Sequence, residues 1–148
     1  MMRSTLEVVR FWLLVILLVG VVGTEAELLL LKHTDGFWQL APVALLGITV
    51  IALAWATFAK SAASVRALQF VMLLVFVSGA VGTIQHFRGN VGYERESNPS
   101  LAGFELYKSA MMGSTPALAP GVMIQLALIG LLLTYRHPSL SKQDGASS

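Results

Sequence analysis

The chain has 148 residues, of which 55% are hydrophobic and only 12% are charged, and its formal net charge is +2. An average soluble domain has about 25% charged residues, so the composition is not that of a soluble protein. The absence of cysteine excludes disulfides, thiolate metal sites and iron–sulfur clusters. Nucleic-acid binding is not indicated, because there is no basic cluster interleaved with aromatic residues. Composition therefore predicts an all-α integral membrane protein.

Four apolar segments are long enough to cross a bilayer, at about 8–31, 38–58, 67–87 and 116–135. Each has roughly 20 residues or more, which as an α-helix spans a hydrocarbon core of about 30 Å. The second and third segments contain no Asp, Glu, Lys or Arg. We therefore expect residues 1–148 to form a single domain of four transmembrane helices.

The distribution of basic residues predicts the orientation, because cytoplasmic segments of membrane proteins are enriched in Lys and Arg. The N-terminus, the 59–66 loop and the C-terminal tail together hold six basic and two acidic residues. The opposite side holds four basic and six acidic residues. We expect both termini to be cytoplasmic and the long 88–115 loop to lie on the outer side, in the periplasm or outside the cell.

The 88–115 loop is long enough to contain an element of its own. Asn98-Pro99 is typical of a helix N-cap followed by proline at the first helical position, and Gly113 would end that helix. Four apolar residues repeat at near-helical spacing: Leu101, Phe104, Tyr107 and Met111. The pattern predicts a short amphipathic helix over 98–113 that lies on the outer membrane surface or caps the helix bundle. The polar tail, 139–148, is expected to be disordered.

Two similar patterns occur in the same order in each half of the chain. GVVGT at 20–24 in the first span matches GAVGT at 79–83 in the third. LAP at 40–42 in the second span matches LAP at 118–120 near the start of the fourth. The sequence therefore predicts a duplicated helical hairpin, with a pseudo-twofold axis along the membrane normal as in parallel transporter repeats.

The repeat also predicts helix packing at its four glycines. Small residues let membrane helices approach closely. We therefore expect spans one and three to meet near the axis through these positions: Gly20, Gly23, Gly79 and Gly82.

Glu27 and His86 follow those glycines at equivalent positions of the two copies. An ionisable residue near the membrane is a functional candidate, and a carboxylate beside an imidazole can bind a divalent metal or shuttle a proton. His33 and Asp35 would add two ligands to the same outer pocket. The alternative is an ion pair or hydrogen bond between Glu27 and His86 that only fixes the helix register.

Three functions remain open from the sequence. The leading hypothesis is a non-catalytic accessory or interaction subunit, which contacts another membrane protein or a second copy of itself within the lipid bilayer. The second is binding of a divalent metal or redox cofactor at the carboxylate–histidine cluster, although no fixed ligand spacing supports it. The third is a small proton- or cation-coupled transporter, although no charge lies deep in a span. No catalytic arrangement of nucleophile, base and acid is evident.

Overall fold

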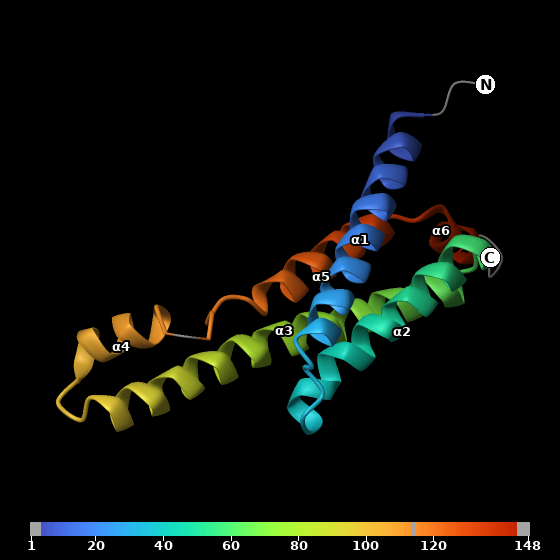
Figure 1. Ribbon diagram of the computed structural model, residues 1–148. Coiled ribbons are helices and arrows are strands. Elements are labelled where there is room, and N and C mark those ends of the chain that lie inside the picture. Colours follow the sequence, from blue (N-terminus) through green and yellow to red (C-terminus); the bar gives the residue numbers. More distant parts are fainter. Residues whose placement is uncertain (1–3, 114, 145–148) are drawn as a thin grey trace.

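The computed structural model of the chain describes residues 4–113 and 115–144. Within these ranges it forms six helices and no strand (Figure 1): α1 (Thr5–Leu30), α2 (Phe37–Ala59), α3 (Ala62–Ser97), α4 (Gly103–Met111), α5 (Gly121–Thr134) and α6 (Pro138–Asp144). In this part of the chain, α1, α2 and α3 are the helices long and apolar enough to cross a membrane. They are consistent with an integral membrane protein.

The fourth predicted span is shorter than the sequence suggested. Of residues 116–135, only Gly121–Thr134 are α-helical, because 117–120 form turns in which the carbonyls of residues 116 and 118–120 accept from the amides three residues later. At about 1.5 Å per residue, α5 is about 21 Å long, which is less than the thickness of a hydrocarbon core of about 30 Å. The all-helical fold class is confirmed, whereas four complete spans are not.

Local side-chain caps explain where α1 and α3 begin. The Ser4 hydroxyl accepts from the Glu7 amide, and the Glu7 carboxylate accepts from the Ser4 amide, which is a capping box. Ser61 and Ser64 form the same reciprocal pair at the start of α3. Lys60 is the C-cap of α2 and Ser61 is the N-cap of α3, so the two helices are joined by these two residues alone.

Basic residues in left-handed backbone conformation follow the ends of three helices. Lys32 after α1, Lys60 after α2 and Arg136 after α5 have φ angles of 51°, 48° and 46°. At the end of α1 the His33 amide donates to the Leu28 carbonyl, which closes a Schellman turn. This turn reverses the chain and fixes the position of His33 beside the helix that precedes it.

The third helix continues ten residues beyond the predicted end of its span, from Phe87 to Ser97. The sequence suggested a loop over 88–115, but Gly89 and Gly92 are both helical, and a Cβ at either position would meet nothing within 4 Å. The Asn98-Pro99 pair, interpreted as the start of a helix, in fact ends α3. Proline disfavours helical conformation in the residue before it, and Asn98 has φ −141° and ψ 78°.

The short helices also differ from the prediction. The helix expected over 98–113 covers only Gly103–Met111, and it packs on α3 through Leu106 and Ala110. Phe104 and Tyr107, two of the four repeating apolar residues, are 74% and 51% exposed on the surface of the chain. The tail expected to be disordered is helical over Pro138–Asp144, while 145–148 lie outside the described residues.

The described helices pack around α3, which contacts α2, α4, α5 and α6, whereas α1 packs on α2 and α5. Figure 1 shows α1 crossing α5 steeply. The buried core lies where α1, α2, α3 and α5 approach one another, and its fully buried members include Leu17, Leu46, Met72 and Val75.

The glycine contacts correct the expected helix packing. A Cβ at Gly79 would lie 2.9 Å from the Pro120 carbonyl oxygen, and one at Gly82 would lie 2.9 Å from the Pro120 Cβ. Gly20 faces Leu126 of α5, whereas Gly23 has nothing within 4 Å. Within the described residues α1 and α3 do not pack on each other. The close approaches are therefore to α5, because α5 and the turn before it lie beside both helices.

Candidate functional site

A large pocket opens between the end of α1, the starts of α2 and α5, and the middle of α3. Its volume is about 900 Å³, and we call it the large pocket. Its walls are the last two turns of α1 with His33, the first turns of α2 from Trp38 to Leu45, the face of α3 from Leu74 to Gly89, and residues 115–123. The lining includes three of the four predicted site residues: Glu27, His33 and His86.

The large pocket is polar at one end and mostly apolar at the other. Along α3 the lining extends over about 22 Å at 1.5 Å per residue. Gln85 and His86 lie at the end nearest α4, whereas Leu74, Val77 and Val81 lie deeper, with Ser78 among them. On the other walls, Glu27, His33 and Gln39 lie near the polar end, and Leu45, Val122 and Met123 lie deeper. The shape suits a ligand with an apolar body and a polar head.

His86 is oriented by a backbone carbonyl. Its Nδ1 lies 3.1 Å from the Pro116 carbonyl oxygen. A carbonyl can only accept, so Nδ1 carries the proton in this contact, and in the neutral ring Nε2 is then an acceptor. The sequence predicts a contact between His86 and Glu27, direct or through water, and the hydrogen bond described for His86 is to Pro116. Both residues line the same pocket, but the described hydrogen bonds join His86 to the turn before α5.

Asn90, one turn beyond His86 on α3, holds the same segment in place. Its side chain is 3% exposed, and its Nδ2 donates to the Ala110 carbonyl at 2.9 Å and to the Thr115 carbonyl at 2.6 Å. These two bonds join α3 to the end of α4 and to the residue before Pro116. Asn90 is thus a positioning residue for the contact that orients His86.

His33 and Glu27 enter the pocket from the end of α1. Burial, followed by the nearby His86, lowers the pKa of His33 below its ordinary value. His33 is therefore neutral at pH 7, and it presents one donor and one acceptor nitrogen. Glu27 is exposed, as expected of a carboxylate at the mouth of a pocket. Of the described residues that line the pocket, none is Lys or Arg.

The predicted metal-binding set is not assembled. Asp35 does not line the pocket, and its amide donates to the Gln39 side chain at the start of α2. In residues 4–113 and 115–144, no three His, Asp or Glu side chains are close enough together to hold a metal ion. Glu25 is also absent from the described lining of the pocket.

Sequence reasoning missed two polar residues of this site. Gln39 and Gln85 carry no charge and belong to no known spacing, so neither attracted notice as a site residue. Asn90 had a usable signal, because Gly82, His86 and Asn90 recur every four residues, which places them on one face of a continuous helix. The sequence places Asn90 beside His86 only if the helix continues past the predicted span, and residues 88–115 were expected to form a loop.

Comparison with known proteins gives no match: no family model, no curated protein and no solved structure is similar to this chain. The interpretation of the pocket therefore depends on its residues alone.

Proposed function

We propose that this chain is an integral membrane protein that binds an amphipathic molecule in the large pocket, with an apolar body and a cationic or hydrogen-bond-donating head. One observation carries the proposal. A pocket of about 900 Å³, mostly apolar along its depth, collects Glu27, His33, His86 and two glutamines near one end.

The polarity of that end favours a donor head over an anionic one. Glu27 is an acceptor when ionised, and the Pro116 contact makes Nε2 of neutral His86 an acceptor. The described lining offers no Lys or Arg to balance a bound carboxylate or phosphate. An ammonium or hydroxyl head therefore fits the groups that are present, and an anionic head would face Glu27.

The size and setting favour a lipophilic ligand. Sites for small molecules have volumes of about 300–1,000 Å³ and are mostly apolar, with a few placed polar groups. Helices α1, α2 and α3, which form three of the walls, are long and apolar enough to cross a membrane. A ligand dissolved in the bilayer would lie beside these walls.

The proposal includes the duplicated hairpin and the orientation of the chain in the membrane. Helices α1, α2, α3 and α5 contact one another in a ring, and exchanging α1 with α3 and α2 with α5 maps this ring onto itself. This supports the duplicated hairpin, although Gly20 and Gly79 both face α5 and so depart from strict symmetry. The proposed orientation, with both termini cytoplasmic, would place the polar end of the pocket on the outer side. An accessory role for the protein remains a separate prediction.

Fluorescence quenching in lipid nanodiscs tests the proposal. The chain has three tryptophans, and Trp38 lines the pocket. In a Trp12→Phe, Trp55→Phe background, Trp38 reports alone. The probes are three nitroxide-labelled alkyl chains of equal length that end in an ammonium, a hydroxyl or a carboxylate group.

We expect saturable quenching by the ammonium probe at roughly tenfold lower concentration than by the carboxylate probe, because a hydrogen bond to a charged group contributes about 1.5–3 kcal/mol. Glu27→Gln should remove this preference. Glu7→Gln is the matched control, because Glu7 does not line this pocket and Gln also completes a capping box. Equal quenching by all three probes, or a preference that survives in Glu27→Gln, would overturn the proposal.

A further inference from the structure

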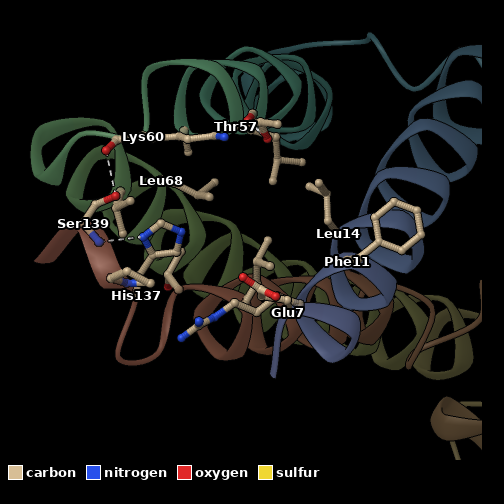
Figure 2. Close-up of a pocket in the computed structure, with 15 residues that line it drawn as sticks. Glu7, Phe11, Leu14, Thr57, Lys60, Leu68, His137 and Ser139 are labelled. Atoms are coloured by element: carbon tan, nitrogen blue, oxygen red, sulfur yellow. Dashed lines mark hydrogen bonds between the residues drawn. The ribbon is translucent and has the colours of Figure 1, made fainter. Parts of the chain in front are cut away.

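A second cavity lies at the end of the molecule where α2 and α5 end and α3 begins. Its volume is about 480 Å³, and we call it the small pocket. Figure 2 shows Lys60 and Thr57 along one side, Glu7 opposite them and His137 at one end. The residues come from the start of α1, the end of α2, the start of α3 and the 133–139 segment. None of the predicted site residues belongs to this pocket.

Two basic side chains and one carboxylate line the small pocket: Arg10, Lys60 and Glu7. One nitrogen of Arg10 donates to the Tyr135 and Arg136 carbonyls, at 3.2 and 2.8 Å, so the side chain is held across the end of α5. A guanidinium has five N–H groups, and these two contacts use one nitrogen of three. The Glu7 carboxylate accepts from the Ser4 amide in the capping box. Positive charge therefore predominates.

His137 adds a neutral donor. Its Nδ1 accepts from the Ser139 amide at 3.3 Å, so the proton of the neutral ring is on Nε2, which lies on the side of the ring away from Ser139 (Figure 2). Burial, followed by the charge of Arg10, lowers the pKa of His137 below its ordinary value, which keeps the ring neutral at pH 7. The Ser139 hydroxyl in turn donates to the Lys60 carbonyl at 2.7 Å. Lys60 and His137 are thus tied to one another through Ser139.

The remaining walls are apolar. They consist mainly of side chains from the four helices that meet here, including Phe11, Leu14, Leu53, Leu68 and Leu133. The cavity therefore combines cationic and N–H donors at its rim with a surface on which an alkyl chain can pack. Free inorganic phosphate would use only the first of these features, whereas a phospholipid would use both.

We propose that the small pocket binds the phosphate-bearing head of an anionic phospholipid, with Arg10, Lys60 and the His137 Nε2–H as donors and the upper part of an acyl chain against the leucines. Basic pockets between transmembrane helices are suited to anionic head groups because both the charge and the apolar stem are matched. This proposal concerns a different pocket from the large one, a different end of the molecule and a head group of opposite charge. It does not depend on any ligand in the large pocket.

Histidine side-chain NMR in nanodiscs tests the proposal on the whole chain. The sequence has three histidines, so ¹⁵N-histidine labelling gives three imidazoles, of which only His137 lies in this pocket. Nanodiscs of phosphatidylcholine are compared with nanodiscs that contain a rising fraction of phosphatidylglycerol. A third sample contains phosphatidylcholine nanodiscs with inorganic phosphate in the buffer. We expect the His137 Nε2 signal to shift saturably with phosphatidylglycerol, with smaller changes at His33 and His86.

The variant Lys60→Asn tests the charge without straining the backbone, because Asn tolerates the left-handed conformation of this position. It should raise the phosphatidylglycerol fraction at half-saturation roughly fivefold, since one basic residue near a membrane surface is worth about 1 kcal/mol. Arg66→Asn is the matched control: Arg66 is exposed, lies beside Val65 in the first turns of α3 and does not line the pocket. A second variant, Ala56→Phe, fills the pocket and should abolish the shift.

Each result decides the question. A saturable shift that Lys60→Asn weakens and Arg66→Asn does not supports the site. An equal shift in the phosphate sample assigns the pocket to the free anion and overturns the lipid proposal. The proposal is also overturned if His137 does not respond to phosphatidylglycerol, or if Ala56→Phe, folded by its thermal transition, responds like the natural chain.

Discussion

The large and small pockets each contain an oriented histidine, but the two rings present opposite hydrogen-bonding groups. At His86 the neighbour of Nδ1 is the carbonyl of Pro116, so Nδ1 donates and Nε2 of the neutral ring accepts. At His137 the neighbour of Nδ1 is the amide of Ser139, so Nδ1 accepts and Nε2 donates. The charged residues follow the same division, with Glu27 in one pocket and Arg10 and Lys60 predominating in the other. The backbone around each imidazole therefore determines which kind of ligand atom it can meet.

The largest expected effect concerns the contact that holds α5 beside α3, since α5 contributes to both pockets. Gly79→Ala would place a Cβ 2.9 Å from the Pro120 carbonyl oxygen and 3.0 Å from the Ile124 amide nitrogen. Because these are backbone atoms, overpacking should lower the free energy of unfolding by about 1–3 kcal/mol. Gly23→Ala, with nothing within 4 Å, should raise it by up to about 1 kcal/mol. Unfolding titrations in mixed micelles measure both, and similar effects in the two variants would contradict the packing described.

A second prediction separates the pockets through Asn90. Asn90→Ala removes two hydrogen bonds, to the Ala110 and Thr115 carbonyls, which at about 0.5–1.5 kcal/mol each should cost about 1–3 kcal/mol of stability. Because Asn90 positions the segment that contains Pro116, the variant should also weaken ammonium-probe binding in the large pocket. Phosphatidylglycerol binding in the small pocket should be unchanged. If both sites weakened equally in folded protein, Asn90 would be a residue of general stability only.

A third prediction exchanges single hydrogen-bonding groups. In His86→Asn the amide can still donate to Pro116, and in His137→Asn the amide oxygen can still accept from Ser139, but neither variant retains the Nε2 atom. Each should weaken its own pocket's ligand about two- to tenfold, the value of one hydrogen bond of 0.5–1.5 kcal/mol, and leave the other pocket unchanged. Binding measured in both assays for both variants forms the complete test. Crossed effects would show that the pockets are not independent.

The smallest expected effect is a pH dependence of stability. Both His33 and His137 have pKa values lowered on folding, chiefly by burial. The unfolded chain, with ordinary values of about 6.5, binds more protons in the range below that pH, so folded-state stability should decrease as pH falls from about 6.5 toward the lowered values. Above about 6.5 the contribution is complete. Thermal midpoints between pH 7.5 and 5 should therefore vary less in His137→Asn than in the natural chain, and an identical slope would argue against the burial of this ring.

The sequence was informative where one segment alone decides the structure. Unbroken apolar runs identified α1, α2 and the middle of α3. The comparison of the two predicted copies identified Glu27 and His86 as equivalent positions, and both residues line the same pocket. The sequence was misleading at Asn98-Pro99, because proline is compatible with a helix start and also forces the preceding residue out of a helix. The hydrogen bonds of the buried Asn90 side chain, which lies in the continued part of α3, could not be foreseen, because their acceptors are 20 and 25 positions away in the sequence.

The pairing of helices and the small pocket could not be predicted for a different reason. A face with small residues indicates that some helix approaches closely, but which helix depends on the packing of the whole domain. Gly79 and Gly82 face Pro120 rather than α1. Arg10, Lys60 and His137 line the small pocket, but they come from three separate segments, and no sequence pattern relates their positions. In the sequence, Arg10 and Lys60 contribute only to a count of basic residues at one end, and His137 is not part of that count.

Lys32, Lys60 and Arg136 place long cationic side chains where the backbone favours glycine. The left-handed conformation costs a non-glycine residue roughly 1 kcal/mol, while a cation after the end of a helix recovers part of this through the helix dipole. Replacement of Lys32 or Arg136 by glycine should therefore make the protein more heat-resistant without altering a core contact. The natural chain thus operates below the highest stability open to its fold, and retains charge at its helix ends instead.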